Sequence, residues 1–92
     1  MIKSFADKHT ELLWNGETPK QFSAISKVAL RKLDMLNAAH LLSDLLIPPG
    51  NRLESLKGDR LGQHSIRIND QWRVCFIWAE GDVEDVEIVD YH

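Results

Sequence analysis

The last three residues of the sequence, Asp90, Tyr91 and His92, all carry side chains that can exchange protons. Imidazole does so near neutral pH, and this is the chemistry of general acid–base catalysis. Just before them Val86 and Ile88 alternate with acidic residues, a pattern that predicts a strand. A paired strand would hold the three side chains in a sheet, whereas an unpaired terminal segment would be a solvated tail.

A second group of candidate residues lies upstream and combines the cations Lys57, Arg60 and Arg73 with Glu54. Cleavage of RNA without a metal ion needs this kind of set. A base takes the proton of the 2′-hydroxyl, cations stabilise the charged phosphorane, and an acid protonates the departing 5′-oxygen. Lysine and arginine on strand surfaces are most often merely solvated. Composition alone is therefore compatible with a nuclease but does not favour that function over others.

Size and composition indicate one soluble globular domain, residues 1–92, with 43% hydrophobic and 27% charged residues. The single cysteine, Cys75, excludes an internal disulfide and lies in an apolar run typical of a buried position. No apolar stretch has the length of a membrane span, and residues 1–5 lack the hydrophobic region of a signal peptide. These features predict a cytoplasmic protein that does not bind membranes.

Metal and cofactor motifs are not apparent in the sequence. The four histidines are dispersed, no second cysteine is present, and no glycine-rich phosphate loop or nucleophile elbow appears. We therefore expect no metal and no cofactor.

Charge is distributed unevenly along the chain, although the net charge is only −3. Residues 51–79 carry five cations against three acids, whereas residues 80–92 carry six acids and no lysine or arginine. The asymmetry favours one basic surface for a polyanion and an acidic edge elsewhere.

The first half of the chain predicts a short strand followed by helices. Residues 1–5 read as the strand, and Asp7 can cap a short helix that ends at Asn15-Gly16. Thr18, Pro19 and Gln21 are typical of a helix start, and the apolar spacing that follows predicts a helix to about residue 39. Residues 41–47 can add a helical turn before Pro48-Pro49-Gly50 breaks the pattern.

The second half predicts four strands, at residues 52–56, 63–68, 71–79 and 83–89. Asn69-Asp70 is a candidate two-residue turn between the second and third. In the third strand Trp72 shares one face with Val74, Phe76 and Trp78, and Arg73 lies on the other. The order of elements predicts an α+β domain with helices on one sheet face. The second face would then be free for chemistry, and Arg73 should emerge on it.

Several segments together resemble the HigB toxins of the RelE/ParE superfamily. They are residues 1–5, Leu56-Lys57-Gly58-Asp59-Arg60, residues 65–74 and the closing Asp90-Tyr91-His92. The resemblance covers essentially the whole chain. It implies a RelE-like fold, in which an N-terminal strand and two helices pack on one face of a mainly antiparallel sheet.

The function that this resemblance implies is that of a bacterial type II toxin. Such a toxin is a ribosome-dependent mRNA endonuclease, and a HigA-type helix-turn-helix antitoxin neutralises it. DNA would be met only indirectly, through the antitoxin.

Residue roles follow from the resemblance position by position. It implies that Lys57 and Arg73 are phosphate or transition-state cations, that Asp90 and His92 are acid–base candidates, and that Tyr91 orients the substrate or transfers a proton.

Three further arginines, Arg52, Arg60 and Arg67, are candidates for binding RNA or the ribosome. Arg67 could instead pair with the acidic final strand. Glu54 stands where some family members have a histidine. A glutamate can accept a proton but cannot supply positive charge, so its part in catalysis stays open.

Two alternatives remain at this stage. One is a binding protein like the ParE branch of the superfamily, which shares the fold but poisons DNA gyrase. The other is a degenerate toxin kept only as the partner of its antitoxin. The ending Asp90-Tyr91-His92 and Lys57 favour the nuclease, because they would have no catalytic task in a gyrase poison.

Overall fold

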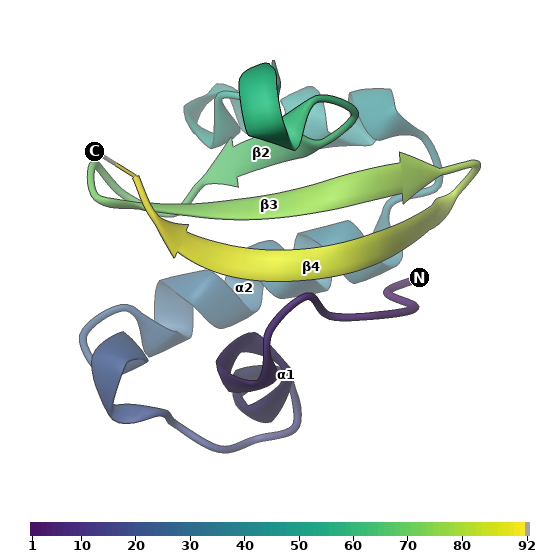
Figure 1. The fold of residues 1–92 in the computed structure, drawn as a ribbon. Coiled ribbons are helices and arrows are strands. Elements are labelled where there is room, and N and C mark those ends of the chain that lie inside the picture. Colours follow the sequence, from purple (N-terminus) through teal and green to yellow (C-terminus); the bar gives the residue numbers. More distant parts are fainter. Residues whose placement is uncertain (92) are drawn as a thin grey trace.

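Four antiparallel strands form a single sheet in the order β1-β2-β3-β4, and both α-helices lie on one of its faces (Figure 1). The computed structural model describes residues 1–91. The α-helices and strands are α1 Lys8–Trp14, α2 Ser26–Ala38, β1 Glu54–Ser55, β2 His64–Arg67, β3 Trp72–Ala79 and β4 Asp82–Asp90. Short 3-10 helices occupy η1 Lys20–Phe22, η2 Leu42–Leu46, η3 Pro49–Asn51 and η4 Gly58–Arg60. The predicted α+β class is confirmed.

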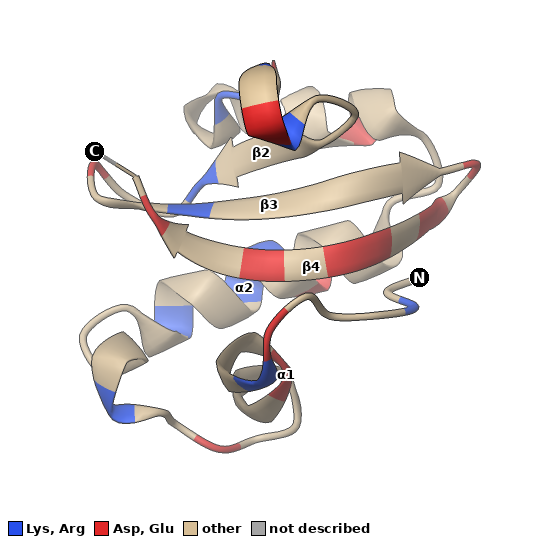
Figure 2. Ribbon diagram, viewed as in Figure 1, with Lys and Arg blue, Asp and Glu red and all other residues tan. Residues whose placement is uncertain are grey.

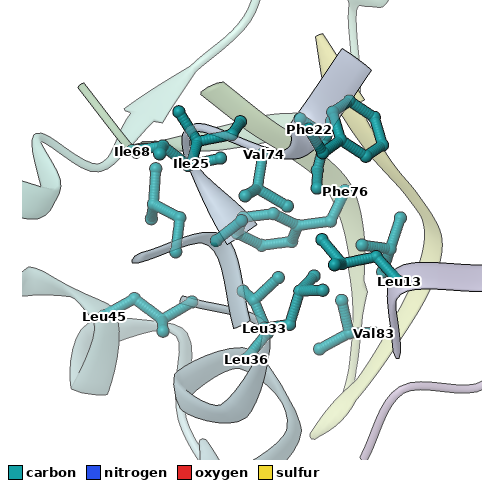
Figure 3. Close-up of a cluster of buried hydrophobic side chains, with 14 of the residues drawn as sticks. Leu13, Phe22, Ile25, Leu33, Leu36, Leu45, Ile68, Val74, Phe76 and Val83 are labelled. Atoms are coloured by element: carbon teal, nitrogen blue, oxygen red, sulfur yellow. The ribbon is translucent and has the colours of Figure 1, made fainter. Parts of the chain in front are cut away.

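The hydrophobic core lies between the helices and the sheet. Val74 and Phe76 of β3 are fully buried on the face that carries α2, as their alternation predicted. The helices and loops meet them with apolar side chains, shown in Figure 3: Leu13, Phe22, Ile25, Leu33, Leu36 and Leu45. Trp72 packs against this cluster and meets the ring of Phe22 edge to face at 5.6 Å. The parity of β3 therefore determines which face of the sheet remains for a site.

The helix expected from Thr18 onward is interrupted, contrary to the prediction. Residues Lys20–Phe22 form only the 3-10 turn η1, and α2 begins at Ser26 after Ile25, whose ψ is 2°. No side-chain cap forms at either start. Both Phe22 and Ile25 are nevertheless buried in the core, as their spacing predicted.

Strand β1 is shorter than the predicted 52–56. Arg52 adopts a left-handed conformation with a φ of 47°, which is incompatible with an extended strand, and β1 begins only at Glu54. The loop between β2 and β3 also differs from the prediction. It contains four residues, 68–71, rather than two, because the last registered pair is Arg67 with Arg73 and β3 begins at Trp72.

A β-bulge interrupts the pairing of β3 with β4. Cys75 pairs with Glu87 and Ile77 with Glu84, so one residue of β3 faces two of β4. Asp85 lies in the bulge with a φ of 51°. The hydroxyl of Ser4 accepts a hydrogen bond from the Asp85 amide at 2.9 Å and so links the N-terminal segment to the bulge.

The N-terminal segment runs alongside β4 (Figure 1) and covers its outer edge. The predicted strand at residues 1–5 takes the form of two parallel bridges, Ile2 with Val83 and Phe5 with Val86. Further along, the hydroxyl of Thr10 in α1 accepts a hydrogen bond from the amide of Ile88 at 3.0 Å. Strand β4 is therefore hydrogen-bonded to β3 on one side and to the N-terminal segment and Thr10 on the other, so it does not form an exposed strand edge.

None of the helices within residues 1–91 combines the length and the apolar character needed to cross a membrane.

Candidate functional site

The second face of the sheet is less open than the sequence suggested. The segment that contains η4 lies over it (Figure 1), and Arg60 from this segment bonds to Glu87 of β4. Beneath it Cys75 is buried, and Arg73 is only 8% exposed. The expectation that Arg73 would emerge on the surface was wrong, because its guanidinium bonds to carbonyls at the start of β3 and in the preceding loop and packs on the ring of Tyr91.

A pocket of about 390 Å³ forms where this segment meets the sheet. It is lined by Glu54, Ser55, Leu56, Lys57, Arg60, Cys75, Val89 and Tyr91. Four residues that the sequence singled out for chemistry or RNA binding thus line one cavity: Glu54, Lys57 and Arg60 from one short segment, and Tyr91 from the end of the chain.

The sheet register explains why these groups share a face. Glu54 pairs with Ser65, Ser65 with Cys75 and Cys75 with Glu87, which makes one row across all four strands. Residues directly opposite one another in a sheet project from the same face. The carboxylates of Glu54 and Glu87 therefore belong to the pocket face, at the two ends of a row whose centre is buried.

Arg73 lies in the next row, between Arg67 and Val89. Its Nη1 donates to the carbonyl of Asn69 and, at 3.3 Å, to that of Trp72. Its guanidinium carbon lies 4.8 Å from the centroid of the Tyr91 ring. The cation is thus held in place, and its Nε is a buried donor that none of residues 1–91 satisfies.

The loop between β2 and β3 builds this environment. The side-chain oxygen of Asn69 accepts hydrogen bonds from the amides of Gln71 and Trp72, both at 2.8 Å, which fixes the loop carbonyl that binds Arg73. The carbonyl of Gln71 accepts a hydrogen bond from the amide of Tyr91, so the same loop also fixes the end of the chain.

Asp90 is placed differently from its neighbour Tyr91. It pairs with Trp72 and shares strand parity with the buried Ile88, so its side chain is directed to the helix-covered side of the sheet. Gln71 Nε2 donates to its carboxylate at 3.0 Å. Asp90 is not among the residues that line the pocket. His92 lies outside the described residues.

Positive charge continues beyond the pocket toward the ends of β2 and η3. Arg67 forms its ion pair with Asp70 of the adjacent loop rather than with the final strand, so that pairing prediction was wrong. The hydrogen bond from Arg67 lowers the pKa of the Asp70 carboxyl, and the charges of Arg52 and Arg73 add to the effect. Figure 2 shows the predicted asymmetry, with acids along β4 and cations at the adjoining ends of β2 and β3.

Sequence reasoning missed two groups in this region. Lys32 of α2 donates to the side-chain oxygen of buried Asn51 at 2.6 Å, and burial, followed by the charges of Arg31 and Arg67, lowers its pKa. Glu87 was counted only as an acid of the final strand. Its place beside Arg60 depends on the bulge, which the sequence pattern does not reveal.

Cys75 was predicted to be a small buried hydrophobe, and this is confirmed. Burial is the main cause that raises the pKa of its thiol, so the sulfur stays protonated at neutral pH. It forms part of the pocket floor without the character of a nucleophile.

Known proteins share both the sequence and the fold. The family described as RelE-like toxin of type II toxin-antitoxin system HigB matches residues 3–92. Toxin HigB-1 of Vibrio cholerae is 42% identical over 83 residues, which cover 88% of this chain and 87% of that protein. Endoribonuclease HigB of Proteus vulgaris is 32% identical over 98 residues and spans 100% of both chains.

Among solved structures, the YoeB-YefM toxin-antitoxin complex of Staphylococcus aureus contains a chain with the same fold. The match has a TM-score of 0.63 and 22% identity, and it covers 100% of this chain and 95% of that one. The arrangement of two helices on a four-stranded antiparallel sheet is thus that of the RelE-like toxins. Within that class the chain belongs to the HigB family of type II toxin–antitoxin systems. The predicted family is confirmed, and the name of the Proteus relative agrees with the predicted endoribonuclease class.

Proposed function

We propose that this protein is a ribosome-dependent mRNA endonuclease that inhibits translation through metal-independent attack by the RNA 2′-hydroxyl. The observation that carries the proposal is the pocket in which Glu54, Lys57, Arg60 and Tyr91 meet, with Arg73 beneath the Tyr91 ring. A carboxylate beside several cations is the set that RNA cleavage by an internal nucleophile requires.

The roles follow from position. Glu54 is the carboxylate that lines the pocket within the described residues, so we assign it to the removal of the 2′-hydroxyl proton. The oxygen then attacks phosphorus, and a 2′,3′-cyclic phosphate forms as the bond to the 5′-oxygen breaks. Lys57 and Arg73 stabilise the phosphorane charge, and Tyr91 orients the nucleotide.

The leaving 5′-oxygen must receive a proton, which we assign to the C-terminal segment. His92 is the natural donor because imidazole titrates near neutral pH. Asp90 is directed to the other side of the sheet from Tyr91 and is held by Gln71. Its contribution is therefore to hold the C-terminal segment in place or to change how readily His92 gives up its proton.

Dependence on the ribosome follows from charge. A chain with a net charge of −3 has too few cations to hold RNA through its phosphates unaided. The ribosome would present the mRNA to the pocket, and the exposed Arg52 together with Arg67 would contact ribosomal RNA.

The partner that completes the system is an antitoxin of the HigA type with a helix-turn-helix. Its support is the membership of the chain in a family of type II toxin–antitoxin systems and the YoeB-YefM complexes that share its fold. The toxin would meet DNA only through that antitoxin, and we place the whole system in the cytoplasm.

Mapping of the 5′ ends of cellular mRNA after brief induction tests the proposal. We expect new ends in translated frames that carry a 5′-hydroxyl, which a matched Arg73→Lys strain lacks. Ends that carry a 5′-phosphate would indicate attack by water and would contradict the mechanism. A DNA-damage response without mRNA cuts would indicate a ParE-like gyrase poison, and neither response would indicate a degenerate toxin.

A further inference from the structure

Arg60 is the one pocket cation whose guanidinium is anchored by two side chains within residues 1–91. Its Nη1 donates to Gln63 Oε1 and to Glu87 Oε1, both at 3.1 Å. The hydrogen bonds that hold it come from this single nitrogen, so Nη2 and Nε remain without a side-chain partner among the described residues. The residue also lines the pocket, and its side chain is 39% exposed.

The bulge in β4 is what brings Glu87 to this place. Glu84 and Glu87 are three residues apart, so in a regular strand they would project from opposite faces. The bulge at Asp85 adds one residue, and both glutamates pair with β3 residues of the pocket face. It also lets Val83 and Val86 both be buried on the opposite, core side.

Gln63 supplies the second anchor from the same segment as Arg60. Its amide donates to the carbonyl of Arg60 at 3.0 Å, and its carbonyl accepts from the amide of Leu56 at 2.9 Å. The backbone therefore fixes Gln63 before its side chain binds Arg60. Two rigid elements, the bulged strand and this closed turn, determine one orientation of the guanidinium.

We propose that Glu87 and Gln63 are positioning residues that hold Arg60 ready to bind a phosphate of the mRNA in the pocket. This inference rests on the proposed function and moves Arg60 from ribosome docking to the cleavage site. Guanidinium binds phosphate through parallel N–H donors, and anchoring at Nη1 leaves Nη2 and Nε to do so. Holding the group in one geometry removes motion that would otherwise be lost when RNA binds.

The competing interpretation is a surface ion pair with no function, and exposed pairs of this kind usually contribute little. The two interpretations differ in how the residues depend on one another. If Glu87 acts through Arg60, its removal must have no effect once Arg60 is absent.

Single-turnover cleavage of mRNA on purified ribosomes by the full-length protein makes the distinction. We expect Glu87→Ala to lower the rate about tenfold, since small displacements of a substrate-contacting group reduce rates by up to about a hundredfold. Glu87→Gln keeps an oxygen acceptor and should retain most of the rate. Glu84→Ala, on the same strand but outside the pocket lining, is the matched control and should cleave like the parent.

The double-mutant cycle is the decisive arm. The variant with both Arg60→Ala and Glu87→Ala should cleave at the rate of Arg60→Ala alone. Equal losses from Glu87→Ala with and without Arg60 would overturn the inference while the nuclease function stands. So would an Arg60→Ala variant that cleaves at the parental rate.

Folding and function are separated by further controls. If Glu87→Ala melts at a lower temperature than the parent, Gln63→Ala provides the same test from the other anchor, with a smaller expected loss of about threefold. A parent protein that does not cleave mRNA on ribosomes would overturn the proposed function itself and this inference with it.

Discussion

The guanidinium carbon of Arg73 lies 4.8 Å from the centre of the Tyr91 ring, and the ring covers it. Arg73 is 8% exposed, whereas Tyr91 is 42% exposed and lines the pocket. The arginine therefore lies below an aromatic ring rather than on an open surface. A cation over an aromatic face is stabilised by the ring, so each residue fixes the other.

Replacement of Arg73 should remove most of the activity even when positive charge is kept. In Arg73→Lys the ammonium cannot reproduce the planar contacts with the carbonyls of Asn69 and Trp72 or the stacking on Tyr91. We expect a loss of roughly a hundredfold, the usual effect of losing one electrostatic contact worth about 3 kcal/mol. Single-turnover cleavage on ribosomes measures it, and a melting curve verifies the fold. A folded variant with the parental rate would exclude Arg73 from the mechanism.

The cleavage rate should depend on the ring of Tyr91 but not on its hydroxyl. Tyr91→Phe keeps the contact with Arg73, whereas Tyr91→Ala removes an interaction worth about 0.5 to 2 kcal/mol. We expect near-parental cleavage for the first variant and a loss of about tenfold for the second. If both lose activity equally, the phenol itself transfers a proton and the orienting role assigned to Tyr91 is wrong.

The role of Glu54 can be read from the pH dependence of cleavage. A general base works only when deprotonated, so activity falls as pH drops below its pKa. Glu54→Gln should lower the rate by about a hundredfold. Glu54→His keeps a side chain that can accept a proton, so it should retain activity, but the fall of the rate on the acidic side should move to higher pH, because imidazole holds its proton to higher pH than a carboxylate does. An unchanged pH dependence in Glu54→His would assign the base elsewhere.

Asn51 should be important for stability rather than for cleavage. It is fully buried, donates to the carbonyl of Leu45 at 3.1 Å and accepts from Lys32 at 2.6 Å. Asn51→Ala leaves these groups unpaired and should reduce the free energy of unfolding by about 2 kcal/mol. Urea denaturation measures the change, with Ser43→Ala at an exposed position as control. A change as small as that of the control would show that water replaces the side chain.

Cys75 should react slowly with thiol reagents in the native protein. Burial raises the pKa of its thiol, and the thiolate is the reactive form. The rate of reaction with a disulfide reagent at neutral pH should therefore lie far below that of the same protein in denaturant. Rapid labelling of the folded protein would mean that the floor of the pocket opens readily.

The face of β3 that carries the core could be predicted because alternation along a strand is a local property. The same alternation correctly predicted that Arg73 lies on the opposite face, but it did not predict that Arg73 is buried. That burial reflects the contacts of Arg73 with the Asn69 carbonyl of the preceding loop and with the ring of Tyr91. A contact between a strand residue and the end of the chain leaves no periodic signal in the sequence.

The helix start predicted at Thr18 failed although its residue types suit a capping box. No side-chain cap forms at η1 or α2, and Ile25 leaves the helical conformation before α2 begins. In the site, the resemblance to a family identified the residue types, and the sheet register then showed which of them meet. The structure brings Tyr91 to the pocket and directs Asp90 away from it, a distinction that follows from strand parity.

The N-terminal segment that lies along β4 has a consequence for the synthesis of the protein. Ser4 binds the backbone of Asp85, 81 residues later, and Phe5 is bridged to Val86. During translation these first residues have no partner until the last strand has been made, and such distant pairings form slowly. The sheet, and with it the pocket, can be completed only near the end of elongation. A nascent chain therefore lacks the complete pocket until the whole of β4 has been synthesised.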